Sequence, residues 1–197
     1  MKYRSFLLDP TLYALLAMNL YMIYHYSLYP DSIHTIIALY WVQSVLIGLF
    51  NFLDILTLRK VVSGSFKMND QKMDSKGCAA FFFLFHYGFF HLAYLIFLFT
   101  SIDRQKIDWK FMAIGFWIIV ASHAITFIQH KIRYNTVPGN LGYMFFLPYL
   151  RIVPMHLMIL VPAFLGVSSY MLFLVLKTVF DLIMYVVSTR MMYKVES

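Results

Sequence analysis

The sequence contains one cysteine, Cys78, in 197 residues, so it can form neither an internal disulfide nor a cysteine-rich metal site. Charged residues make up only 13% of the chain, whereas a soluble domain carries about a quarter. Internal repeats, heptads and low-complexity tracts are also lacking. These absences exclude a disulfide scaffold and a repeat protein, and they argue against a soluble globular domain.

Apolar sequence is what the chain has in abundance. Hydrophobic residues account for 61% of it, and the mean hydropathy is +0.72. A membrane-spanning helix needs about 20 predominantly apolar residues. Six stretches qualify, at residues 11–29, 34–58, 78–100, 109–130, 149–166 and 168–189. We therefore predict an all-α fold: a polytopic membrane helix bundle with about six transmembrane helices, which forms a single integral membrane domain over residues 1–197.

The basic residues are divided unevenly between the predicted loops. Twelve Lys and Arg residues fall in the N-terminus, the 59–77 loop, the 131–151 segment and the C-terminus, against three between the third and fourth spans. Loops rich in Lys and Arg stay in the cytoplasm, so both termini are predicted to be cytoplasmic. The same loops account for the net charge of +7, so we expect membrane lipids as partners and no nucleic acid.

Five polar side chains lie at similar depths in five different spans. They are Asn51, His86, His123, His156 and Asp181. Each lies 5 to 10 residues from the nearest predicted cytoplasmic charge, which places most of them about 12–15 Å from the inner surface. Ionisable groups inside a bilayer are costly and mark functional sites. Three imidazoles with a carboxylate suit Zn²⁺, so we predict a metal site made of His86, His123, His156 and Asp181.

Each of these residues also has a purely structural interpretation. A single histidine in a membrane helix usually hydrogen bonds to a neighbouring helix. Lys177 and Asp181 are spaced i,i+4 and could form an internal ion pair without chemistry. Asn51 and Asp54 share one face of the second span and could hold helices together. His91 lies about 140° around the third span from His86, the predicted ligand on that span, so it fits the metal site less well.

Several short motifs occur along the chain. They are Tyr40-Trp41, Gly48 to Asn51, Phe85 to Phe90, Ser122-His123, Arg151 to His156, and Lys177 to Leu182. Together they resemble a family of bacterial and archaeal integral membrane proteins that is known only as a domain of unknown function. The resemblance covers nearly the whole chain. It implies that the three histidines and Asp181 recur in the family and that the protein lies in a prokaryotic inner membrane, but it implies no activity. An acidic residue often follows the Tyr-Trp-x motif in this pattern, and here that position is Gln43.

A looser analogy links the predicted site to the alkaline ceramidases and adiponectin receptors, which hold zinc with three transmembrane histidines near the cytoplasmic side. The first hypothesis is therefore a zinc-dependent hydrolase of a lipid or another membrane-embedded ester or amide. Zinc lowers the pKa of its bound water to about 7. Asp181 would be a fourth ligand, an orienter of a histidine or the general base. Asn51 or Lys177 would stabilise the oxyanion.

Two further hypotheses remain open. A haem-binding membrane cytochrome would use two histidines on facing helices as axial ligands, for example His86 with His156 or with His123. A non-enzymatic ion or proton relay, or a transporter, would use Lys177 and Asp181 together with Asp54, and a homodimer would supply the second half of a transporter.

Overall fold

Helices make up most of the computed structural model, which describes residues 10–62, 67–68, 71–72, 76–133, 138–157 and 170–191. The long helices are α1 (Pro10–Leu28), α2 (Ile33–Leu56), α3 (Lys76–Ser101), α4 (Trp109–Arg133) and α7 (Tyr170–Met191). The shorter α5 (Leu141–Phe146) continues through the 3-10 helix η4 (Leu147–Arg151) into helical residues 152–157. Two further 3-10 turns are η2 (Pro30–Ser32) and η3 (Arg104–Lys106). The prediction of an all-helical bundle is confirmed, with one small exception in the 59–77 loop.

That exception is a two-stranded antiparallel hairpin. Strands β1 (Lys67–Met68) and β2 (Gln71–Lys72) pair there, where no regular structure was predicted. Two residues in each strand are too few to form a layer of the fold.

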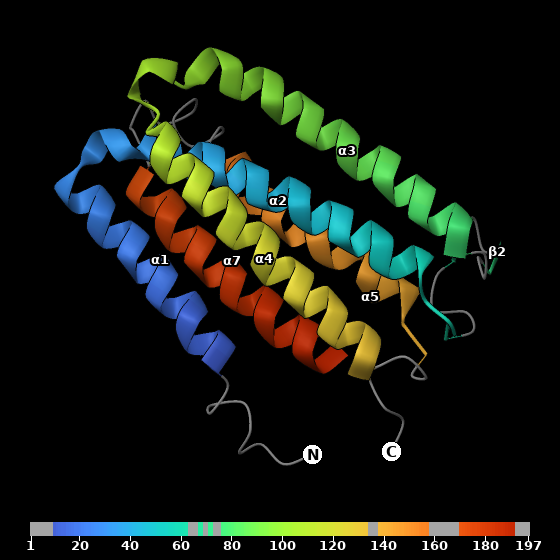
Figure 1. Ribbon diagram of the computed structural model, residues 1–197. Coiled ribbons are helices and arrows are strands. Elements are labelled where there is room, and N and C mark those ends of the chain that lie inside the picture. Colours follow the sequence, from blue (N-terminus) through green and yellow to red (C-terminus); the bar gives the residue numbers. More distant parts are fainter. Residues whose placement is uncertain are drawn as a thin grey trace.

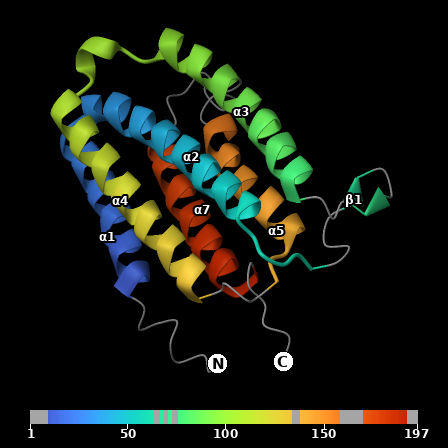
Figure 2. The same cartoon turned by 45° about the vertical axis from the view of Figure 1, so that its right-hand side comes forward.

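Helix α2 lies at the centre of the bundle. It packs against α3 and α4 and also contacts η4, whereas α1 packs mainly against α7. Figure 1 shows α3 along one side of α2 and α1, α4 and α7 on the other. The rotated view in Figure 2 gives the same order of helices. The central position of α2 explains why charged residues are nearly lacking along it and why so many of its apolar side chains are buried.

Three of the helices in the described part of the chain are long and apolar enough to cross a membrane. They span Pro30–Leu56, Lys76–Thr100 and Trp109–Gln129, and they coincide with the predicted spans 34–58, 78–100 and 109–130. Helices α1 and α7 form where the spans 11–29 and 168–189 were predicted, but neither meets this criterion. The predicted span 149–166 extends beyond the described residues.

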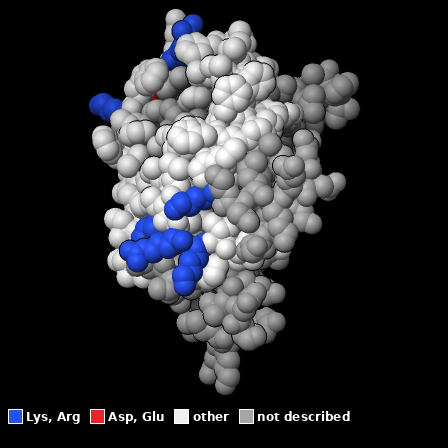
Figure 3. All heavy atoms as spheres, turned by 90° about the vertical axis from the view of Figure 1, so that its right-hand side faces the viewer, with Lys and Arg blue, Asp and Glu red and all other residues white. Residues whose placement is uncertain are grey.

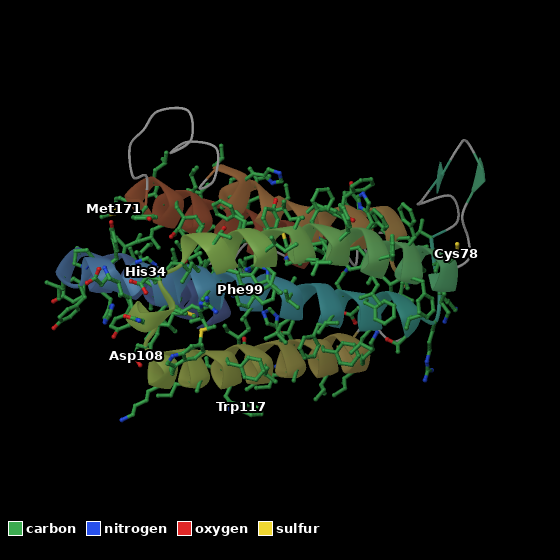
Figure 4. All side chains as sticks on the ribbon, turned by 90° about the horizontal axis from the view of Figure 1, so that it is seen from above. His34, Cys78, Phe99, Asp108, Trp117 and Met171 are labelled. Atoms are coloured by element: carbon green, nitrogen blue, oxygen red, sulfur yellow. The ribbon has the colours of Figure 1, made fainter. Side chains whose placement is uncertain are left out.

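The outer faces of α3 and α4 are apolar and uncovered in the described part of the chain. Only 28% of the apolar window of α3 and 11% of that of α4 is buried inside the protein. The exposed large side chains on these two helices include Phe81, Phe85, Phe89, Leu92, Ile96, Ile114, Trp117, Ile118, Ile125 and Ile128. Figure 4 shows Trp117 pointing away from the bundle. An exposed apolar surface of this extent is typical of contact with lipid or with another protein.

The two ends of the bundle differ in charge. Lys and Arg gather on the end drawn in Figure 3, where α2 ends and α3 begins. Cys78 lies at this end, whereas His34 and Asp108 lie at the opposite end (Figure 4). At that opposite end Lys106 Nζ contacts Asp31 Oδ1 at 2.9 Å, and this hydrogen bond raises the pKa of Lys106. The start of α1 and the end of α7 are on the basic side (Figure 1).

A glycine allows α2 and α3 to approach closely. A Cβ atom on Gly48 would lie 2.7 Å from Cδ1 of the Tyr87 ring. The ring has little freedom to move, because the Tyr87 hydroxyl is 2.9 Å from Ser44 Oγ and donates to the Ser44 carbonyl. Position 48 therefore requires a residue without a side chain.

We predict that Gly48→Ala lowers the stability of the protein by about 1–3 kcal/mol, because an overpacked contact must shift the Tyr87 ring. The measurement is thermal unfolding of the purified protein in detergent. Gly88→Ala on α3 is the matched control, since a Cβ there meets no atom within 4 Å. Equal melting temperatures for the two variants would contradict the proposed close approach.

Candidate functional site

Three charged side chains are buried together where α7 meets η4. Asp181 lies between Arg151, whose Nη2 is 2.9 Å from Oδ1, and Lys177, whose Nζ is 2.8 Å from Oδ2. The exposed fractions are 1% for Asp181, 5% for Arg151 and 2% for Lys177. Lys177 reaches the carboxylate because residues four apart face the same side of a helix. The ion pair that the i,i+4 spacing suggested is therefore present, and Arg151 joins it from a distant part of the chain.

Helix α1 completes this cluster with one amide. Asn19 Nδ2 donates to Asp181 Oδ2 at 3.3 Å, and Lys177 Nζ donates to Asn19 Oδ1 at 2.7 Å. The Thr178 hydroxyl lies 3.4 Å from the same Asn19 oxygen. The amide thus bridges the cation and the anion. We call Asn19, Arg151, Lys177 and Asp181 the buried ion cluster.

Tyr40 on α2 holds the cluster from the remaining side. Its hydroxyl donates to the Arg151 carbonyl at 3.1 Å, and its ring lies 5.6 Å from Lys177 Nζ, within range of a cation–π interaction. Phe173 packs edge-on against the Tyr40 ring, with centroids 5.4 Å apart. Side chains from α1, α2, η4 and α7 therefore converge on one carboxylate.

The charges of the cluster do not balance. Arg151 and Lys177 supply two basic groups against the one carboxylate of Asp181. Arg151 Nε and Nη1 are buried and have no hydrogen-bond partner among the described residues. A buried guanidinium with two unpartnered nitrogens is costly, so a further partner on this face of Arg151 would stabilise it.

The three predicted histidine ligands point to different partners. His86 is exposed on α3, and its Nδ1 lies 2.6 Å from the Tyr149 hydroxyl. His156 hydrogen bonds to the Tyr94 hydroxyl. His123 on α4 packs against the Phe50 ring, with centroids 5.9 Å apart. His86 and His156 thus hydrogen bond to other segments, as their structural interpretation expected, whereas His123 has an aromatic ring as its neighbour.

Among the described residues, no three His, Cys, Asp or Glu side chains come together where they could hold a metal ion. The structure therefore does not bring three of the predicted ligands His86, His123, His156 and Asp181 together. The sequence argument concerned their depth along the helices, whereas ligation also requires that the side chains face a common point.

The other two predicted catalytic residues, Lys177 and Asn51, lie in different places in the structure. Lys177 is in the cluster. Asn51 instead donates to the Met144 carbonyl at 2.8 Å and so ties α2 to α5. Asp54, on the same face of α2, pairs with Lys131 at 3.0 Å and so ties α2 to α4. The interpretation of this α2 face as a means of holding helices together is confirmed.

The prediction that Arg151 is a cytoplasmic loop charge is wrong. Its position at the start of a predicted span suggested a cytoplasmic loop charge, but the structure buries it against Asp181. It therefore contributes nothing to the orientation argument. The depth of His156, which was counted from Arg151, loses its reference point as well. An arginine that opens an apolar stretch can equally turn inward when a carboxylate is within reach.

Sequence reasoning also missed two buried polar groups. Asn19 is a lone amide in an apolar stretch, which is the signal that could have identified it. His91 was set aside, yet it is buried and its Nε2 lies 2.9 Å from Ser44 Oγ. Its Nδ1 lies 3.0 Å from the Tyr87 carbonyl, within its own helix. This pair joins α2 to α3 and is separate from the cluster.

We predict that Asp181→Asn destabilises the protein by about 3–5 kcal/mol, because it leaves two buried basic groups without their anion. Lys177→Met should cost much less, because Arg151 and Asp181 remain as a neutral pair. Thermal unfolding in detergent measures both, and Lys106→Met at the exposed ion pair is the control that should leave stability unchanged. If Asp181→Asn and Lys106→Met melt together, the cluster does not carry the stability assigned to it.

Comparison with known proteins gives one match. The chain matches, over residues 1–196, the model of a family described as a family of unknown function (DUF6498). No curated protein and no solved structure matches the chain. The analogy with zinc membrane hydrolases gains no support from these comparisons. The match covers nearly the whole chain, as the motif resemblance predicted, and the chain belongs to the DUF6498 family of unknown function.

Proposed function

We propose that this protein is a six-span protein of the prokaryotic inner membrane that moves an ion or a proton, with the buried ion cluster as its working site. The observation that carries the proposal is the burial of Arg151, Lys177 and Asp181 together in a chain with few charges. Charged groups inside a membrane domain are expensive, so they are kept where they serve a substrate or ion pathway.

The membrane assignment is supported by the surface. The uncovered faces of α3 and α4 carry large apolar side chains, and α3 and α4 are two of the three helices long enough to span. Lipid is the partner that such faces suit. The segments 11–29 and 168–189, which form α1 and α7, would add two further spans beside the cluster, since the polar side chains of α1 and α7 are directed to one another. The predicted span 149–166, which extends beyond the described residues, would be the sixth.

The composition of the cluster favours an ion relay over a fixed structural bridge. A structural ion pair needs only one cation and one anion. This site has a second basic group, and Nε and Nη1 of Arg151 have no hydrogen-bond partner among the described residues. The cluster is also built from helices distant in sequence, so a change in its charge would alter how α1 and η4 pack on α7. Coupling between an ion and helix packing is what a transporter requires.

The placement of the histidines supports a zinc hydrolase or a haem cytochrome less well than an ion relay. Both need histidines that face a common point, and His86 and His156 hydrogen bond to different tyrosines. Elemental analysis and an absorbance scan of the purified protein check both alternatives together. One zinc per chain or a Soret band would replace the proposal made here.

The orientation can be tested with the chain's only cysteine. Cys78 is exposed near the start of α3, at the basic end that we assign to the cytoplasm. We predict that a membrane-impermeant maleimide labels it in inside-out vesicles and not in right-side-out vesicles. Cys78→Ser is the control for background labelling. The reverse pattern would place the termini outside.

Ion movement can be tested in proteoliposomes that contain a pH-sensitive dye. We expect the wild-type protein to support proton-coupled flux, above that of empty liposomes, under a gradient of at least one of acetate, chloride, sodium or potassium. Lys177→Met should lower that flux by about tenfold or more, because it removes the second basic group while leaving the Arg151–Asp181 pair. Lys131→Met is the matched control, because Lys131 also pairs with an aspartate but lies outside the cluster. Wild-type flux equal to that of empty liposomes would overturn the proposal.

A further inference from the structure

We propose that the unsatisfied face of Arg151 is a binding site for a small monovalent carboxylate. This inference rests on the proposed function and deepens it, because it names the chemical class of the ion. It is carried by two observations: the excess of basic over acidic groups in the buried ion cluster, and the two guanidinium nitrogens that have no partner among the described residues.

The first observation concerns charge. With both basic groups protonated, the cluster carries one positive charge more than Asp181 can balance. The other described acidic residues are engaged elsewhere. Asp54 pairs with Lys131, and Asp31, Asp103 and Asp108 all lie in or beside the short turns at the non-basic end. The sequence of residues 158–169, which directly follows the described part of the η4 segment, contains no acidic residue. A bound anion is the simplest source of the missing charge.

The second observation concerns shape. Nη2 of Arg151 is used by Asp181, which leaves Nε and Nη1 with donors to offer. The two forked edges of a guanidinium pair Nη2 with Nε and Nη2 with Nη1. Because Nη2 carries one N–H on each edge, the edge that Asp181 leaves free presents two parallel N–H groups that match the two oxygens of a carboxylate. Lys177 already has more partners, because its Nζ contacts Asp181 Oδ2, Asn19 Oδ1 and Met22 Sδ. The ligand is therefore expected on Arg151, while Lys177 contributes charge.

The charge of the ligand follows from the same count. One negative charge makes the cluster neutral, whereas a dianion such as sulfate would leave an excess of negative charge in a buried place. The fork geometry favours a carboxylate over chloride, which can accept N–H groups but cannot match the fork with two oxygens.

Helix α1 controls access in this arrangement. The charged side chains are buried, and α1 covers them through Asn19, which bonds to both Lys177 and Asp181. Within the described part of the chain α1 packs mainly on α7 and the adjacent η2. Displacement of α1 from α7 is thus one rearrangement that would open the cluster to a ligand.

The test is equilibrium binding of radiolabelled acetate to the purified full chain in an uncharged detergent. We expect one saturable site, for which unlabelled acetate competes about tenfold or more better than chloride or sulfate. Arg151→Lys, which keeps the charge but loses the fork, should weaken acetate binding by about tenfold or more. Arg59→Lys, at an exposed loop arginine, is the matched control and should bind as the wild type does.

Two further variants test the charge count without relying on Arg151. Lys177→Met keeps a neutral, folded Arg151–Asp181 pair and should lose acetate binding. Asp181→Asn adds one more uncompensated charge, so in the fraction that remains folded acetate should bind more tightly and sulfate should begin to compete. Absence of saturable binding in the wild type, unchanged binding in Lys177→Met, or equal competition by chloride would each overturn the inference.

The outcomes also separate this inference from the proposed function. Acetate binding with the expected variant pattern but without ion flux in liposomes would leave the carboxylate site standing and overturn transport. Flux that depends on Lys177 in protein that binds no acetate would leave transport standing and overturn the carboxylate site.

Discussion

The pairing of Asp181 with Arg151 and Lys177 is the interaction on which the arrangement of α1, η4 and α7 depends. A buried carboxylate needs a cation, and here it has two, from segments far apart in sequence. Asn19 and Tyr40 add hydrogen bonds that fix α1 and α2 to the same point. Because each of these groups would be costly without the others, the helices that carry them must pack in one way.

The remaining helices are held by different means. Helices α2 and α3 meet at Gly48, where a ring fills the space that a side chain would occupy, and at the hydrogen bond between Ser44 and His91. Helix α4 is joined to α2 at its end by Lys131 and Asp54. Small residues and polar side chains take this role in membrane bundles because lipid removes the hydrophobic drive between helices. The bundle thus has one charged centre and several neutral contacts.

The division between apolar faces and a charged centre bears on function. The outer faces of α3 and α4 are apolar and, within the described residues, uncovered. His86, His123 and His156 each have a tyrosine or a phenylalanine as neighbour. Arg151, Lys177 and Asp181, by contrast, are charged, buried and in contact with one another.

The helices, three of them long and apolar enough to cross a membrane, could be predicted from the sequence alone, as could the difference in charge between the two ends and the i,i+4 pairing of Lys177 with Asp181. These features follow from composition and from spacing along single segments of the chain. Which polar side chains meet could not be predicted in this way. Depth in a membrane can be counted from the sequence, but the direction in which His86 or Arg151 faces depends on how each helix is rotated against its neighbours. That rotation is set by packing among all the helices at once, and it brought Arg151 and Asn19 to Asp181 and directed the histidines elsewhere.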